Sequence, residues 1–174
     1  AVLDEAHTVE SVAADHLGEY GIHSVAELIE AKFIVRKALA AGGRLLLNAD
    51  DEGVVAYAGT LQGGLAPVID WFSLDADSPQ LRQALQAGGR ACYLEDGWLV
   101  AAEGARSRRV APLAEIPATL GGIVRHNVVN ALGAMGIALA FGIDDGSIRA
   151  GLAAFRGGWT LEAAEAVCAD DGID

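Results

Sequence analysis

Two neighbouring residues near the start of the chain, Asp15 and His16, could ligate a cation. They follow an apolar stretch, and a carboxylate oxygen beside an imidazole nitrogen is a common pair of metal donors. A histidine before a loop more often serves as a satisfied hydrogen-bond partner. Lys32 follows on the next predicted helix, where a solvated lysine is the usual outcome. Residue type alone therefore gives only a weak indication of a cation site.

Amide and carboxylate side chains stand at two further places where ligands bind or helices begin. Asn48 and Asp51 follow a short apolar run. Ligands of open α/β sheets bind at such strand ends, although the spacing by itself favours an N-cap of the next helix. His126, Asn127 and Asn130 fall in the first turn of a later helix, with the two amides on one face. Amides in this position can read an adenine edge or cap the helix.

The elements that would position these residues follow from periodicity and from repeated glycine pairs. The pattern predicts strands over 44–48, 67–73 and 90–94, and helices over 25–40, 80–87, 126–141 and 147–155. Residues 97–110 indicate a small antiparallel flap around Gly104. Because helices alternate with short buried strands, we expect an α/β fold in three layers, with a mostly parallel sheet and helices on both faces.

Composition narrows the class of protein. A chain of 174 residues that is 52% hydrophobic can build one sizeable core. The net charge of −12 argues against nucleic acid or a membrane surface as the main partner. The two cysteines, Cys92 and Cys168, are far apart and are expected to be reduced, buried thiols. The most apolar run, 131–141, is too short to span a bilayer, so we expect a cytoplasmic protein.

Several runs resemble, in order and wording, the central ATPase domain of the Mur ligases and, within that family, the cyanophycin synthetase group. These runs are VAADHLG at 12–18, GIH at 21–23, AK at 31–32, LNADD at 47–51, IPATLGG at 116–122, RHNVVNAL at 125–132 and IRAGLAAF at 148–155. The resemblance covers about residues 11–157. It implies a partial nucleotide-binding domain over 1–157 and a divergent tail over 158–174.

The resemblance also implies a reaction and its metal. Mur ligases use ATP to phosphorylate a carboxylate, and an amine then displaces the phosphate to form an amide, with Mg²⁺ neutralising the charge that develops. In this sequence His16 would be a magnesium ligand and Glu5 the magnesium-binding glutamate. Lys32 would be the lysine that family members carbamylate, which converts a cation into an oxygen donor suited to a hard ion.

The nucleotide would be held by the remaining candidates. By resemblance, Asn130 would face the adenine with His126 and Asn127 beside it, and Asn48 and Asp51 would border the nucleotide cleft. The implied partners are ATP and a carboxylate/amine substrate pair, while the oligomeric state stays open between a monomer and a homo-oligomer.

The sequence also departs from the family. It contains no Gly-Lys-Thr loop to cradle phosphates, and both ends look cut, so we expect no turnover from this chain alone. Residues 2–18, with Asp4 and Glu5, resemble the DEAH element of DinG- and XPD-type helicases. A helicase fragment is therefore one alternative, although a net charge of −12 does not suit a DNA motor. A non-catalytic α/β binding module is another.

Overall fold

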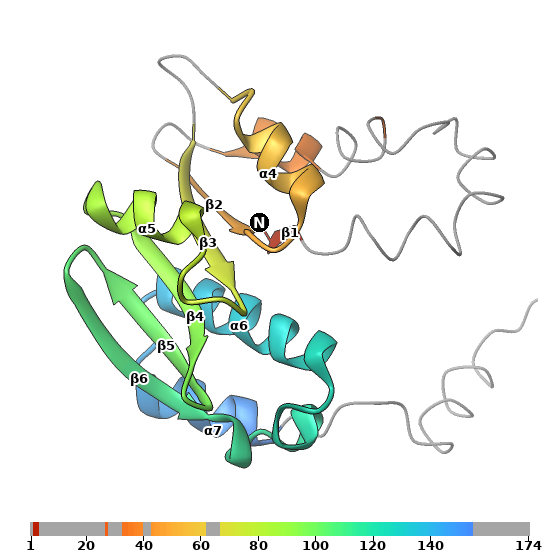
Figure 1. Ribbon diagram of the computed structural model, residues 1–174, viewed down its shortest axis with the longest axis vertical. Coiled ribbons are helices and arrows are strands. Elements are labelled where there is room, and N and C mark those ends of the chain that lie inside the picture. Colours follow the sequence, from red (N-terminus) through yellow and green to blue (C-terminus); the bar gives the residue numbers. More distant parts are fainter. Residues whose placement is uncertain (1, 4–26, 28–32, 40–42, 62–66, 155–174) are drawn as a thin grey trace, which may run out of the picture.

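Six strands form one sheet in chain order, β1-β2-β3-β4-β5-β6 (Figure 1). The computed structural model describes residues 2–3, 27, 33–39, 43–61 and 67–154. The strands are β1 (Val2–Leu3), β2 (Arg44–Asn48), β3 (Val68–Ser73), β4 (Arg90–Glu95), β5 (Trp98–Glu103) and β6 (Arg106–Pro112). Strands β1 to β4 pair in parallel, whereas β4, β5 and β6 pair antiparallel.

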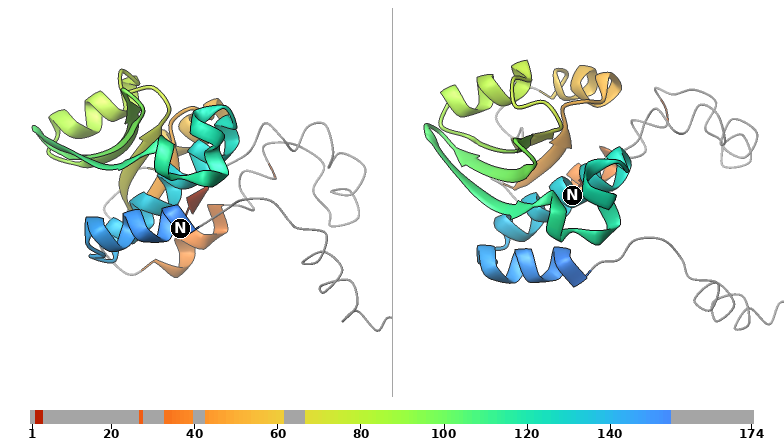
Figure 2. Two further views of the ribbon diagram at one scale, coloured as in Figure 1. Left: turned by 90° about the horizontal axis from the view of Figure 1, so that it is seen from below. Right: turned by 60° about the horizontal axis from the view of Figure 1, so that its bottom comes forward.

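Helices cover both faces of the sheet. They are α4 (Glu52–Ala58), α5 (Pro79–Gln86), α6 (Arg125–Ala140) and α7 (Asp145–Ala154), with short 3-10 helices η2 (Phe33–Ala38), η3 (Leu113–Glu115) and η4 (Pro117–Gly122). Figure 2 shows α4 and α5 on one side of the sheet and α6 and α7 on the other. The predicted three-layer α/β fold is therefore confirmed.

The core follows the alternation of strand side chains between the two faces. In β2, the fully buried Leu45 and Leu47 pack with Val54 of α4. Leu46 between them points the other way and belongs to the cluster that includes Leu132 of α6. A strand buried on both faces has a continuous apolar run in its sequence, and the three leucines within 44–48 form such a run.

Local signals fix where two of the helices begin. The side chain of Asp51 caps α4, because its Oδ1 accepts a hydrogen bond from the Val54 backbone N–H at 3.0 Å. Ser78 occupies the N-cap position of α5 and Pro79 its first turn, where proline is favoured because its N–H would have no helical partner. The antiparallel strands predicted around Gly104 are β5 and β6, and they continue the main sheet beyond β4.

Other predictions fall partly or wholly outside the described residues. Of the helix predicted over 25–40, the structure describes residue 27 and η2. The domain division predicted between 157 and 158 lies outside the described residues, as does Cys168. Cys92 is a buried, free thiol. No helix in the described part of the chain is long and apolar enough to cross a membrane.

Candidate functional site

The predicted magnesium ligands are not placed by the structure. Glu5, His16 and Lys32 all lie outside the described residues, so their roles stay predictions. Within the ranges that are described, no three or more His, Cys, Asp or Glu side chains gather in a way that could hold a metal ion. The sequence candidates that the structure does describe are Asn48, Asp51, His126, Asn127 and Asn130.

Polar side chains connect the carboxyl ends of β2 and β3. Asn48, at the end of β2, is buried and accepts a hydrogen bond at its Oδ1 from the backbone N–H of Asp50 at 2.9 Å. The Asp50 carboxylate accepts a bond from the Ser73 hydroxyl at 2.5 Å and another from the Leu74 N–H at 2.8 Å. The loop after β2 is thereby fixed to the end of β3, at the edge where parallel sheets bind ligands.

Two of these residues were not among the sequence candidates. Asp50 belongs to the same run as Asn48 and Asp51, and Ser73 comes one position after Phe72, which is the register partner of Asn48. Knowledge of the register between β2 and β3 would have placed Ser73 at the same edge, but the sequence does not reveal that register. Asp51 caps α4 as its spacing predicted, and its place beside a nucleotide stays a prediction.

The amide of Asn127, at the start of α6, is held in a defined orientation. Asn127 donates from Nδ2 to the backbone carbonyl of Ala118 at 2.6 Å, and a carbonyl can only accept, which fixes the orientation of the amide. The Nδ2 of Asn130 lies 3.0 Å from Nε2 of His126. The amide oxygens of both residues are acceptors that a ligand could use, and each Nδ2 keeps a second N–H beyond the contact just described.

Both amides line a cavity of about 440 Å³ between α6, α7 and the segment that precedes α6. The rest of its wall is mostly apolar and includes Ile116, Met135 and Ile148. An apolar cavity with a few convergent polar groups is the usual form of a small-molecule site. The structure thus brings Asn127 and Asn130 together in one cavity, whereas the exposed His126 is not among its lining residues.

The direction of α6 shows at which end of the sheet this cavity lies. A second cavity of about 150 Å³ is lined by Leu139 and Ala140 from the last turn of α6, and by Asp70 and Arg90 near the starts of β3 and β4. The helix therefore runs opposite to the parallel strands. Its 16 residues extend about 24 Å, so its first turn lies toward the edge where β2 and β3 end.

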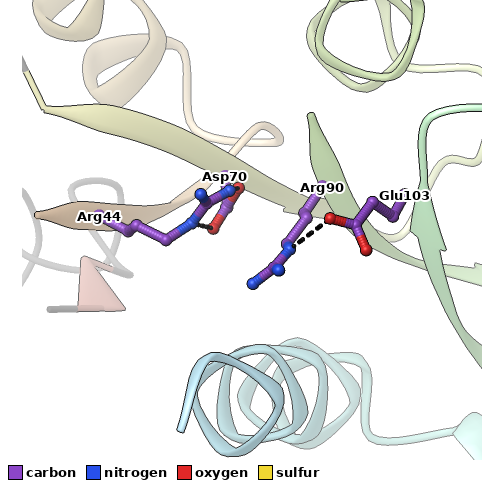
Figure 3. A network of polar contacts seen from close by, with 4 residues as sticks. All are labelled: Arg44, Asp70, Arg90 and Glu103. Atoms are coloured by element: carbon purple, nitrogen blue, oxygen red, sulfur yellow. Dashed lines mark hydrogen bonds and ion pairs between the residues drawn. The ribbon is translucent and has the colours of Figure 1, made fainter. Parts of the chain in front are cut away.

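Paired charges occupy the opposite end of the same sheet face. Arg44 donates from Nε and Nη2 to the two oxygens of Asp70, at 2.6 and 2.5 Å, and Arg90 Nε donates to Glu103 at 3.0 Å (Figure 3). The hydrogen bond from Arg90 holds the pKa of Glu103 below its usual value. Since each of these carboxylates is paired with an arginine, we interpret this end of the sheet as a structural ion-pair cluster.

Comparison with known proteins supports the ligase resemblance and gives no support to the helicase resemblance. No protein-family model matches the chain. The cyanophycin synthetase of Trichormus variabilis is 35% identical over 148 residues, which are 85% of this chain and 16% of that protein. The cyanophycin synthetase of a Synechocystis species is 33% identical over 147 residues, again 16% of its length.

The similarity extends to a Mur ligase. The UDP-N-acetylmuramate–L-alanine ligase of Bordetella pertussis is 33% identical over 150 residues, which are 86% of this chain and 29% of that protein. The chain thus spans about 16% of the length of the cyanophycin synthetases it matches. By homology, the chain is related to the group of ligases that includes cyanophycin synthetase and UDP-N-acetylmuramate–L-alanine ligase, and it shares one segment with them.

Proposed function

We propose that this chain is a nucleotide-binding part of an ATP-dependent amide ligase, which joins a carboxylate to an amine through an acyl phosphate. The observation that carries the proposal is the cavity of about 440 Å³ with Asn127 and Asn130 in its wall. Homology over 85% of the chain supports the reaction class. The acid and the amine that are joined are not part of the proposal, because the chain covers a small share of its relatives.

The chemistry of the cavity suits an adenine base. The flat faces of a purine can lie against apolar walls such as Ile116 and Met135. Adenine presents an exocyclic amino group, and the amide oxygens of Asn127 and Asn130 are acceptors for its N–H bonds. Guanine carries a carbonyl oxygen at the equivalent position, and this oxygen would face the same acceptors without a proton between them. The cavity should therefore prefer ATP or ADP to GTP.

The phosphates would extend toward the loop after β2. In the proposal, Asn48 and Asp51 border this part of the nucleotide, on a loop that Asp50 fixes to the end of β3. Glu5 and a carbamylated Lys32 would hold Mg²⁺ through oxygen donors, which this hard cation takes, and His16 would add an imidazole nitrogen. Bound magnesium would neutralise charge on the phosphoryl group during its transfer.

We expect binding without turnover from the chain alone. The sequence contains no Gly-Lys-Thr loop, and the lysine of such a loop is what reaches the outer phosphates in enzymes that have one. Because the proposed base site does not depend on that loop, nucleotide affinity can be tested on this chain directly.

The test is calorimetric titration of the full chain with ATP, ADP and GTP in the presence of Mg²⁺. We expect ATP and ADP to bind alike and GTP to bind about tenfold more weakly, because its carbonyl oxygen would face the amide oxygens of Asn127 and Asn130. An Asn130→Ala variant should lose a similar factor for ATP. Gln86→Ala, which removes an exposed amide from α5, is the matched control and should bind ATP unchanged.

Two results would contradict the proposal. If Asn130→Ala and Gln86→Ala bind ATP equally well, the cavity is not the base site. If the unaltered chain binds GTP as tightly as ATP, the acceptors in the cavity do not select the base.

A further inference from the structure

Within the described part of the chain, the outer side of β6 has no partner strand. β6 pairs with β5 on one side, and none of the described strands pairs with its other side. The side chains of residues 106–109 are exposed, whereas Val110 and Ala111 are buried. Figures 1 and 2 both show β6 on the outside of the sheet. Every second residue of such a strand presents backbone N–H and C=O groups that another strand can pair with.

Three arginines lie along this edge of an acidic chain, and two of them are paired with carboxylates. Arg106, Arg108 and Arg109 are three of the 12 Lys and Arg residues of a protein whose net charge is −12. Arg108 donates two hydrogen bonds to Asp145 of α7, at 2.7 and 3.0 Å. Arg109 bonds Asp96 at 3.0 Å and lies over a Trp98 ring. These two guanidinium groups are therefore held in place beside the edge.

Arg106 differs from its two neighbours. Its side chain is exposed, and no described residue forms an ion pair with it. Arg106 and Arg108 are two positions apart on β6, so they share one face of the sheet. The edge thus combines unpaired backbone groups with one available cation and a second cation held beside it.

We propose that the β6 edge is a docking site for an extended acidic peptide, which pairs with β6 as an additional strand. Main-chain hydrogen bonds would supply affinity, as in other cases of strand addition. Carboxylates at alternate positions of the peptide would lie opposite or diagonal to Arg106 and Arg108, within the reach of cross-strand pairs.

Charge selects this occupant over a second copy of the chain. If two β6 edges paired with each other in antiparallel fashion, arginines of one copy would face arginines of the other, and like charges in cross-strand positions are destabilising. The net charge of −12 also repels an acidic peptide from most of the surface, so binding would concentrate beside Arg106, the arginine of this edge with which no described residue forms an ion pair. The residues of β6 do not line the cavity between α6 and α7, which makes this site independent of the proposed nucleotide site.

The experiment measures binding of a fluorescent peptide of alternating valine and glutamate to the full chain, by anisotropy. Arg106→Glu should weaken binding about tenfold, since it replaces an attractive pair with a repulsive one. Arg82→Glu makes the same charge change on the exposed surface of α5 and should leave the affinity unchanged. A peptide of the same sequence with N-methyl groups on alternate residues keeps its charge but cannot complete the strand pairing, and it should not bind.

Amide hydrogen exchange locates the contact. We expect the peptide to slow exchange at residues 106–110 and to leave the rest of the described chain unchanged. Equal binding of the N-methylated peptide would show attraction by charge alone and would overturn the proposal. Equal weakening by Arg106→Glu and Arg82→Glu would overturn it as well. So would a dimer whose β6 amides are protected without any peptide, because the edge would then belong to a second copy.

Discussion

Gly136 of α6 lies directly against Leu46 of β2, so closely that a Cβ at position 136 would be 2.5 Å from Leu46 Cδ2. Gly136 and Leu46 are both buried. The glycine therefore sets how near the helix approaches the sheet, and the leucine side chain occupies the space that a larger residue would need.

We predict that Gly136→Ala lowers the free energy of unfolding, although alanine is the better helix former. Alanine gains about 1 kcal/mol in helix propensity over glycine, but overpacking a filled core costs about 1–3 kcal/mol. Urea denaturation should show a net loss on the order of 1 kcal/mol. Adding Leu46→Val should recover part of it by making room.

Gly151 of α7 is the matched control for this prediction. A Cβ at that position meets no atom within 4 Å, so Gly151→Ala should stabilise the protein by up to about 1 kcal/mol. If the two alanine variants change stability in the same direction, the contact with Leu46 does not limit the approach of α6.

The Gly136 contact illustrates which parts of the fold could be predicted. Helices near 80–87 and 126–141 were evident from apolar spacing and from N-terminal signals such as Ser78-Pro79, because these are local properties. The sequence around a glycine in a predicted helix does not indicate which residue packs against that glycine. Its role depends on the crossing of α6 over β2, which joins residues about 90 positions apart and is set by the tertiary packing.

The candidate site also combines features that follow from local sequence with features that depend on the tertiary structure. The capping role of Asp51 was predictable, since the cap and the helix it serves are adjacent in sequence. The bond from Asn127 to the Ala118 carbonyl was not, because it depends on the path of η4. That path includes three residues with positive φ, Leu120 at 47°, Gly121 at 68° and Gly122 at 99°. A leucine in this conformation is unusual, so sequence alone would not have suggested the turn.

The Arg44–Asp70 pair should make the stability of the sheet sensitive to the loss of either partner. The Asp70 side chain is 8% exposed and the Arg44 side chain 33% exposed. Arg44→Met would leave a buried carboxylate without its cation, which typically costs about 3–5 kcal/mol. Because Arg44 is partly solvated, we expect about 2–3 kcal/mol in urea denaturation.

A double variant separates the charge from the packing. Arg44→Met combined with Asp70→Leu removes both charges, and it should recover most of the lost stability because hydrophobic replacements of buried pairs are often neutral. Arg82→Met, at the exposed pair with Asp77, should have little effect. The prediction fails if the double variant is less stable than Arg44→Met alone.

The Cys92 thiol should not react with thiol reagents in the folded protein. Burial, with the nearby charge of Asp70, raises its pKa from 9.0 to about 12, and Arg108 only partly offsets this. The thiolate is the reactive form, so a disulfide reagent at neutral pH should modify Cys92 no faster than the protein unfolds. The measurement needs a Cys168→Ser background, so that Cys92 is the single thiol. Rapid modification without urea would show that the thiol is accessible.

The same raised pKa predicts a loss of stability in alkali. The unfolded chain ionises Cys92 near its ordinary pKa, whereas the folded protein keeps it protonated to about pH 12. The unfolded state therefore binds fewer protons over this range, and the free energy of unfolding should fall as the pH rises above about 9. In a Cys92→Ala variant the part of this decline that is due to Cys92 should be absent.

The Glu115–Arg149 pair predicts a contribution to stability that disappears in acid. The two side chains join η3 to α7 beside the cavity, with Arg149 Nε donating to Glu115 Oε2 at 2.5 Å, and this bond lowers the pKa of Glu115. A carboxylate with a lowered pKa stabilises the fold above its ordinary pKa, and the contribution is lost as the pH falls through the lowered value. Glu115→Gln should therefore be less stable than the unaltered chain near neutral pH, and the difference should shrink toward about pH 3. Urea denaturation of both proteins across this range tests the idea, and a difference that stays constant with pH would mean that Glu115 acts through packing instead of charge.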